Sequence, residues 1–515
     1  MPDSDPHSAS GFRSRLPDLI FGLVIVFCSF FLFHLQFGSA FLLDTDSYFH
    51  LALARFIKAG GFLKDFPWTQ FSTMKDSFSD KDLLLHLYTV PFLWVFKSEL
   101  LAGKLAAWSL GAGFFTAAAL LCRRYLNGYF ASVLALSLFC CPYFVSYSLY
   151  LRPAALAGLF TILSVYFLVR KNRWAVFACS WLYALAHISA FTVIYFAVLC
   201  EVLRKLRDGE FYWRNICFAA AGLAAGFILH PNFPYNIYTV FINGLMAPAL
   251  AAGNSHINFA MELFSLPSKD MLLENFPVAV SFTGMLAVSF WHRPKVSFDT
   301  LVFAASALTY CFLAMVSLRF WYPAVALSAL AAASFARDWF SDTGGNSRPR
   351  KAAFLLVWCV VLAVFGAYSF RKISIRVAQK AVFNQPLEDA AIWMSRNVPP
   401  GEIVFHSLWS DTPYLIYFNP RDYYLVVLDP VYMRYYSPQL QRLYQDMSMG
   451  TVDNMAGVIK ETFGARYVFT MKMVGFYARA REDARFRLIY ENSEVSVFEI
   501  VDSTGSASAK RKLAL

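Results

Sequence analysis

The chain has 515 residues, of which 58% are hydrophobic and 15% are charged, with a formal net charge of +11. Soluble proteins carry about 25% charged residues, so this composition excludes an ordinary soluble protein and indicates an integral membrane protein. The positive charge does not indicate a partner nucleic acid, because the basic residues form short clusters between apolar runs, as the positive-inside rule describes.

The first apolar run, roughly Leu19–Leu43, is long enough to span a membrane and longer than the core of a signal peptide. Arg13 and Arg15 precede it and predict that residues 1–16 are a cytoplasmic tail. The run therefore ends on the outer side. There the stretch DTDSYFH, residues 44–50, opens an outer loop that extends to about residue 82.

Apolar length and Lys/Arg clusters together predict about eleven spans between residues 17 and 369. A second long outer loop is expected at about residues 231–274. The spans on which the later argument depends are about Leu101–Leu121, Phe130–Tyr147, Ile216–Leu229, Thr300–Ser317 and Ala352–Tyr368.

Residues 370–502 are much less apolar and alternate helix-like with strand-like pieces. The strand-like pieces are EIVFHSL, YYLVVLD, ARYVFTM, FRLIYE and VSVFEI, and a helix-like piece covers Leu387–Arg396. This pattern predicts an extracytoplasmic α/β domain, followed by a disordered tail at residues 503–515. None of the nine cysteines lies after Cys359, so neither a disulfide framework nor a thiol-based zinc site is expected.

The predicted topology brings many polar side chains to the outer ends of the spans. They are Asp44, Asp46, His50, Arg152, His187, His230, Glu262 and Arg319. Ionisable groups at membrane depth are costly and usually functional. The alternative is that water and lipid headgroups simply solvate each of them at a span end. Their gathering on one side favours a shared site.

Asp44 and Asp46 alternate, so both point the same way in an extended segment. If a helix begins at Asp46 or Ser47, Asp46 and His50 lie on one helical face. A carboxylate with an imidazole suits a divalent ion such as Mg²⁺ or Mn²⁺, and Asp46 and His50 are the candidate metal ligands. Alternatively, Asp46 caps the helix that follows.

The stretch DTDSYFHLALARFI, residues 44–57, resembles the first-loop motif of the GT-C glycosyltransferases, particularly the oligosaccharyltransferase catalytic subunits. In the stretch FHSLWSDTPYLIYFNP, residues 405–420, Trp409-Ser410-Asp411 resembles that family's WWD motif, without the middle tryptophan. SLRFWYPAVALSALAAA, residues 317–333, resembles its arginine-containing segment, and four predicted spans separate the second outer loop from the last domain, as in that family.

The resemblance implies an inverting enzyme of the inner (cytoplasmic) membrane of a bacterium that takes a polyprenyl-linked sugar donor. Asp44, Asp46 and Glu262 are then the expected catalytic carboxylates. Arg319, with Arg152, is expected to bind the donor phosphate, as a guanidinium binds phosphate through paired hydrogen bonds. Trp409 and Asp411 are expected to contact the acceptor, which is a glycan, a lipid or a protein.

Four functions remain open. A monosaccharide transferase is preferred, and an oligosaccharyltransferase acting on protein from a pyrophosphate donor is the runner-up. The loop between the third and fourth predicted spans holds Arg152 but no carboxylate, whereas the family has an acidic motif there, and this departure favours a non-enzymatic scaffold. A transporter is disfavoured, because the sequence shows no repeated halves.

Overall fold

The structure, a computed structural model, describes residues 6–253, 257–265, 267–342 and 348–501. The chain divides into two compact units. The first unit comprises Met1–Ser39, Lys104–Leu229 and Met261–Ala378. The second comprises Ala40–Gly103, His230–Ala260 and Gln379–Leu515.

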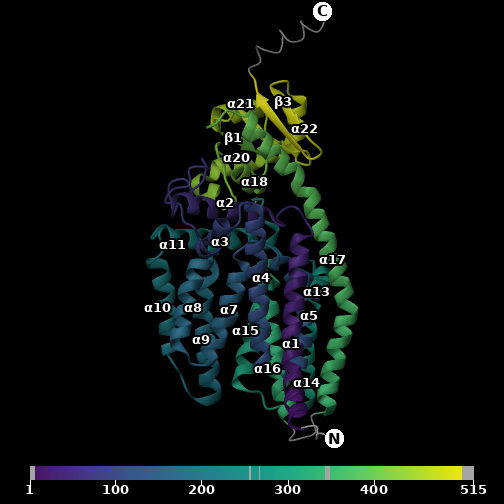
Figure 1. Cartoon of the computed structure of the whole chain (residues 1–515). Coiled ribbons are helices and arrows are strands. Elements are labelled where there is room, and N and C mark those ends of the chain that lie inside the picture. The colour runs from purple at the N-terminus through teal and green to yellow at the C-terminus, as the bar shows by residue number, and fades with distance from the viewer. Residues whose placement is uncertain (1–5, 254–256, 266, 343–347, 502–515) are drawn as a thin grey trace, which may run out of the picture. The chain divides into compact units, whose positions relative to one another are not determined.

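The first unit is built of apolar helices that run side by side (Figure 1). They form where the sequence has long runs of Leu, Ala, Phe and Val. In an apolar surrounding such a run must be helical, because a helix pairs its own backbone groups. The helices are α1 (Pro6–Phe37), α4 (Glu99–Arg123), α5 (Gly128–Leu138), α6 (Pro142–Ser148), α7 (Ala154–Val169), α8 (Arg173–Ala186), α9 (Thr192–Asp208), α10 (Arg214–Ile228), α13 (Ser268–Glu274), α14 (Phe276–His292), α15 (Phe298–Ala314), α16 (Trp321–Ser341) and α17 (Arg348–Asn397).

Among the described residues, four helices are long and apolar enough to cross a membrane. They are Arg15–Phe37, Glu99–Arg123, Leu318–Ser341 and Arg348–Asn397. Further apolar helices of 10–17 residues occupy most of the other predicted spans. The helices therefore lie where spans were predicted, but the count of about eleven spans stays a prediction.

The predicted span Phe130–Tyr147 is not one straight helix, because α5 and α6 form a pair bent by 84°. Pro142 begins α6, and a proline at that point cannot continue the preceding helix. The predicted end of the last span at Tyr368 is not a helix end either. Helix α17 is 50 residues long, continues past Tyr368 to Asn397, and so includes the helix predicted at Leu387–Arg396.

In the second unit, helix α2 (Thr45–Gly60) comes from the first predicted loop, and helix α3 (Leu83–Val95) follows that loop. The helical turns α11 (Tyr235–Thr239), η2 (Val240–Met246) and α12 (Ala247–Ala252) come from the second loop. The C-terminal residues add the 3₁₀ turn η5 (Trp409–Asp411) and helices α18 (Thr412–Phe418), α19 (Val431–Tyr436), α20 (Pro438–Met449), α21 (Met455–Thr462) and α22 (Gly475–Glu482).

A four-stranded sheet of order β1-β2-β4-β3 forms the centre of the C-terminal residues (Figure 1). Its strands are β1 (Val404–His406), β2 (Tyr467–Met471), β3 (Phe486–Glu491) and β4 (Val495–Ile500). The pair β1–β2 is parallel, with Phe405 opposite Val468, and the other pairs are antiparallel. Every residue of β2 and β4 is buried, as in the central strands of a sheet covered on both faces.

One predicted strand is absent, because residues 423–429, YYLVVLD, form only isolated bridges at Tyr423 and Tyr424. The amide of Leu425 donates instead to the ring Nε2 of His406, at 3.1 Å. Leu428 has a φ of +66°, outside the strand region. This buried segment therefore satisfies its backbone with a side chain and loops rather than with a ladder.

Candidate functional site

Three of the predicted site residues meet in the first unit, where Arg152 and Arg319 hold Glu262 between them. The Nη1 of Arg152 lies 2.7 Å from Oε2 of Glu262. Nε and Nη2 of Arg319 lie 2.8 and 2.7 Å from its Oε1. The hydroxyl of Tyr147 donates to Oε2 at 3.1 Å. Both carboxylate oxygens of Glu262 therefore accept charge-assisted hydrogen bonds.

Short, irregular elements position these groups. Arg152 lies in the turn between α6 and α7, Glu262 in the 3₁₀ turn η3 (Met261–Leu263), and Arg319 in η4 (Leu318–Phe320), which precedes α16. The hydroxyl of Ser317 donates to the backbone oxygen of Glu262 at 2.8 Å. The Glu262 loop is therefore fixed to the segment that carries Arg319.

The two guanidinium groups keep Glu262 ionised. Burial alone raises the pKa of Glu262, but Arg319 and then Arg152 outweigh it, so its pKa lies well below the usual range. The side chain of Glu262 retains 18% of its surface, and those of Arg152 and Arg319 retain 16% and 27%. Two guanidinium groups thus converge on one carboxylate, and each keeps part of its surface accessible.

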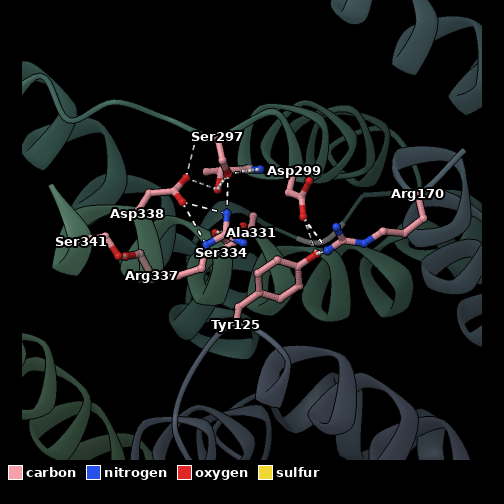
Figure 2. Close-up of polar contacts among 10 residues, drawn as sticks. Tyr125, Arg170, Ser297, Asp299, Ala331, Ser334, Arg337, Asp338 and Ser341 are labelled. Carbon is pink, nitrogen blue, oxygen red and sulfur yellow. Dashed lines mark hydrogen bonds and ion pairs between the residues drawn. The ribbon is translucent and has the colours of Figure 1, made fainter.

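A second charged cluster in the same unit has balanced charges (Figure 2). Arg170 pairs with Asp299 at 2.7 Å, and Arg337 pairs with the neighbouring Asp338 at 2.8 Å. The hydroxyl of Tyr125 also donates to Asp299, at 2.9 Å. Two arginines thus meet two carboxylates, and these pairs hold α15 and α16 to the ends of their neighbours. This arrangement is that of a structural clamp.

In the second unit, Asp44 and Asp46 lie at the start of α2. The helix begins at Thr45 with Asp44 as its N-cap residue, so the alternative that Asp46 caps it is wrong. Asp46 lies in the first turn, where a negative charge is favourable, and His50 follows one turn later on the same face. Asp44 and His50 are buried, at 6% and 3% exposed.

A chain of buried hydrogen bonds leads away from His50. Its Nδ1 lies 2.9 Å from Nε2 of His86 in α3. The Nδ1 of His86 lies 2.7 Å from Oδ2 of Asp80. His86 and Asp80 are 1% and 6% exposed. Sequence reasoning missed both, because His86 lies within an apolar helix and Asp80 within a polar loop, where neither residue type is unusual.

The segment His230–Asn232 fixes the backbone of Asp80. The Oδ1 of Asn232 accepts the amide of Asp80 at 3.2 Å, and Nε2 of His230 donates to the carbonyl of Asp80 at 3.0 Å. The Nδ1 of His230 accepts the amide of Asn232, and burial lowers the pKa of His230. His230 therefore joins the two predicted outer loops within the second unit. His187, by contrast, lies in the first unit at the junction of α8 and η1 (Ile188–Phe191).

Trp409 and Asp411 form η5 directly before α18, so a Trp-x-Asp sequence does open a helix after a strand, as predicted. The indole Nε1 of Trp409 donates to the carbonyl of Asn258 at 2.9 Å. Asp411 is only 2% exposed, and burial raises its pKa to about 8. A contact between Asp411 and an acceptor therefore requires this carboxyl to be uncovered.

The described residues contain no group of three or more His, Cys, Asp or Glu side chains arranged to hold a metal ion. His50 directs one ring nitrogen to His86 rather than to a shared centre. Among the described residues, Asp46 and His50 therefore belong to no group of three metal ligands, and their role as metal ligands stays a prediction. A structure of the Archaeoglobus fulgidus oligosaccharyltransferase has been determined in complex with Zn and sulfate.

No protein-family model and no curated protein matches the chain. Several solved structures do match the chain. The apo oligosaccharyltransferase of Archaeoglobus fulgidus aligns with a TM-score of 0.64 at 13% identity, over 94% of this chain and 74% of its own. Apo ArnT from Cupriavidus metallidurans aligns with a TM-score of 0.58 at 13% identity, over 96% and 98%. The arabinofuranosyltransferase AftD from Mycobacteria aligns with a TM-score of 0.57 at 11% identity, over 95% and 40%.

These three proteins are GT-C glycosyltransferases. The expected resemblance is thus confirmed at the level of structure. The apolar helices and the small C-terminal sheet agree with it. The chain is a multi-pass membrane protein with the GT-C glycosyltransferase fold.

Proposed function

We propose that the protein is an inverting membrane glycosyltransferase that transfers a sugar from a polyprenyl-phosphate donor to an acceptor on the extracytoplasmic face of a bacterial inner membrane. The observation that carries the proposal is the cluster of Arg152, Glu262 and Arg319, in which two guanidinium groups converge on one carboxylate. A guanidinium binds phosphate through paired hydrogen bonds. The fold supports it. ArnT has been solved with undecaprenyl phosphate bound, and the archaeal enzyme AglB with an inhibitory peptide and a dolichol-phosphate.

Arg319 and Arg152 bind the donor phosphate and stabilise the charge that develops on it as it leaves. Their guanidinium groups are held in place by Glu262 before any substrate arrives. A preorganised hydrogen-bond donor of this kind contributes about 3–4 kcal/mol of transition-state stabilisation. We assign Glu262 to positioning these arginines rather than to proton transfer, because its lowered pKa makes it a weak base.

Asp46, with Asp44 beside it, is the general base in this proposal. An acceptor hydroxyl or amide attacks the anomeric carbon from the face opposite the phosphate. The new bond from the acceptor to that carbon forms while the bond from carbon to phosphate oxygen breaks. The phosphate departs with the electron pair, and the acceptor proton passes to Asp46. The configuration at the anomeric carbon is inverted.

A second candidate is oligosaccharyl transfer to protein from a pyrophosphate donor. The sequence Trp409-Ser410-Asp411 at the start of α18 favours it, as does the alignment with the archaeal oligosaccharyltransferase. The burial of Asp411 disfavours it. An acceptor peptide and a glycan or lipid acceptor, offered in parallel, distinguish the two.

The test is donor turnover by the full chain in lipid nanodiscs. A panel of polyprenyl-phosphate and polyprenyl-pyrophosphate sugars is offered, and sugar transfer is followed by mass spectrometry with and without EDTA. We expect turnover to be lost in Asp46→Ala and donor binding to weaken in Arg319→Gln. Arg170→Gln removes an arginine from the balanced cluster and should leave both intact.

Each outcome bears on the proposal. Turnover that survives in both Asp46→Ala and Asp44→Ala contradicts the assigned base. Donor binding without turnover by the wild type, under every acceptor and metal tested, contradicts the enzyme and supports a scaffold or transporter. Loss of turnover with EDTA means that a metal takes part and that the described residues do not show its whole site.

A further inference from the structure

Two basic side chains of helix α17 converge on a second buried carboxylate, that of Glu274 at the end of α13. Its Oε1 lies 2.5 Å from Nζ of Lys372 and 2.5 Å from Nη2 of Arg376. Neutral hydroxyl groups of Tyr368 and Ser146 accept further bonds from these two side chains, at 3.0 and 3.4 Å. The side chain of Glu274 retains 2% of its surface, whereas Lys372 and Arg376 retain 28% and 33%. The carboxylate is therefore covered, and both cations keep surface for a ligand.

This basic cluster lies where the apolar run of α17 ends. The sequence has no charged residue between Lys351 and Arg371, a stretch close to the roughly 20 residues that a membrane span requires. Lys372 and Arg376 follow directly on the same helix. Basic pockets between spans, at the depth of the lipid head groups, bind anionic head groups. The cluster is therefore placed where a lipid phosphate can reach it.

An apolar cavity of about 240 Å³ lies between helices α1, α5 and α17, which run beside one another (Figure 1). Its main lining residues are Phe31, Phe139, Leu362, Gly366, Phe370 and Ile373. Phe370 is 52% exposed, and the cavity is open on one side. An apolar cavity of about 150 Å³ already binds a ligand of the size of benzene, so this one accommodates a segment of a lipid chain.

The cavity wall and Arg376 share one face of α17. Leu362, Gly366, Phe370 and Ile373 follow one another at the spacing of a single helical face. Arg376 continues this series one turn after Ile373. Along one face of the helix, an apolar cavity is thus followed by a basic group at the head-group end. A ligand that occupies both has an apolar chain and an anionic head.

We propose that this face of α17 binds an anionic phospholipid of the surrounding bilayer, with one acyl chain in the cavity and its phosphate at Lys372 and Arg376. The occupant follows from charge complementarity. Two cations share one carboxylate, and the exposed Arg371 adds a further positive charge, so an anionic head group is the matching ligand. A guanidinium also binds phosphate through paired hydrogen bonds. The inference does not depend on the proposed function.

The test is lipid binding to the full chain, purified in detergent and followed by native mass spectrometry. Phosphatidylglycerol, phosphatidylcholine and undecaprenyl phosphate are titrated as the anionic, zwitterionic and polyprenyl probes. We expect phosphatidylglycerol to bind most tightly at this site. Arg376→Gln should weaken its binding by about 10-fold or more, as the loss of a charge-assisted hydrogen bond does. The matched control is Arg442→Gln, at an exposed arginine of α20 in the second unit, which should bind as the wild type does.

The cavity offers a second variant that leaves the basic cluster intact. A side chain added at Gly366 would meet no atom within 4 Å of its Cβ, so leucine fits there. Gly366→Leu should fill part of the cavity and weaken phosphatidylglycerol binding by about 10-fold, because it displaces methylene groups of the bound chain. Gly284→Leu is the control. Gly284 lies in α14, outside the cavity lining, and its Cβ position is equally open.

The outcomes decide between the occupants. Equal affinity of the wild type for phosphatidylglycerol and phosphatidylcholine contradicts a charged site. Phosphatidylglycerol binding that survives both Arg376→Gln and Gly366→Leu overturns the inference. Undecaprenyl phosphate that binds more tightly than phosphatidylglycerol, and is weakened by the same two variants, overturns the assignment to a bilayer phospholipid. If Arg376→Gln does not fold, Gly366→Leu with its control still decides whether the cavity holds the lipid chain.

Discussion

Arg319 contacts a single oxygen of Glu262 through two nitrogen atoms, with Nε at 2.8 Å and Nη2 at 2.7 Å from Oε1. This forked contact fixes the plane of the guanidinium group. A planar donor group held at a known angle suits a phosphate, whose oxygens accept paired hydrogen bonds. The contact therefore prepares the arginine for its proposed ligand before that ligand arrives.

The first prediction concerns Arg319→Lys. Lysine keeps the charge but has no fork, so it cannot be held by Glu262 in the same way. Loss of one charge-assisted hydrogen bond costs about 1.5–3 kcal/mol, or roughly 10- to 100-fold. We expect KM for the polyprenyl-phosphate donor to rise by about that factor. Arg170→Lys is the matched control, and a KM that rises equally in both variants would mean that Arg319 does not contact the donor.

The second prediction concerns the acid stability of the same cluster. Glu262 has a pKa lowered from its ordinary 4.5. The stability that its ionised form contributes is therefore complete above about pH 4.5 and is lost as the pH falls through the lowered value. We expect wild type to unfold at a higher temperature than Glu262→Gln between pH 6 and 8. Below about pH 4.5 the difference in Tm should shrink.

The control for this measurement is Glu461→Gln, because Glu461 is an exposed carboxylate in the second unit. Its Tm should follow that of the wild type at every pH. A Glu262→Gln variant that is as stable as the wild type at neutral pH would show that the two arginines do not need the carboxylate between them.

Sequence reasoning found the members of this cluster for two separate reasons. Arg152 and Arg319 stand out because charge is rare next to apolar helices, and the resemblance singled out Arg319. Glu262 was selected because it is an acidic residue in the second predicted outer loop. The short helix that presents Tyr147 was not predicted, because the run Phe130–Tyr147 is apolar throughout and hydropathy does not register the break before Pro142.

The hydrogen bonds that connect Asp80, His86 and His50 could not be predicted from the sequence. His50 and His86 are 36 positions apart, and Asp80 and His230 are 150 apart, so no local pattern links them. The strand predicted at residues 423–429 was wrong for a different reason. Their β-branched and aromatic composition is that of a strand, but His406 and the neighbouring loops take up their backbone groups.

The third prediction tests the clamp in Figure 2. The Oδ2 of Asp338 accepts the amide of Ser297 at 2.8 Å and the hydroxyl of Thr300 at 2.7 Å, at the start of α15. Each buried group left unsatisfied costs about 1–3 kcal/mol. We expect Asp338→Ala to lower Tm clearly while the donor KM stays unchanged. Asp342→Ala, at an exposed aspartate one turn later, is the control. A changed donor KM would contradict a purely structural role for the clamp.

The fourth prediction follows from the burial of Asp411, which raises its pKa from 3.8 to about 8. Between these values the folded protein keeps a proton that the unfolded chain releases, so stability falls as the pH rises, by at most about 1.4 kcal/mol per pH unit. Asp411→Asn cannot release this proton. We expect its Tm in the full chain to be less dependent on pH between 5 and 8 and higher than that of the wild type at pH 8.

The exposed Asp446 lies in the same part of the chain, and Asp446→Asn should leave the pH dependence as it is in the wild type. The result also bears on the acceptor. If an acceptor peptide binds through an ionised Asp411, adding that peptide should lower the pKa of Asp411 and release a proton near pH 7. If instead the Tm of the wild type depends on pH to the same extent as that of Asp411→Asn, Asp411 is ionised and solvated in the folded protein. The oligosaccharyl-transfer alternative would then have a carboxylate available to bind its acceptor.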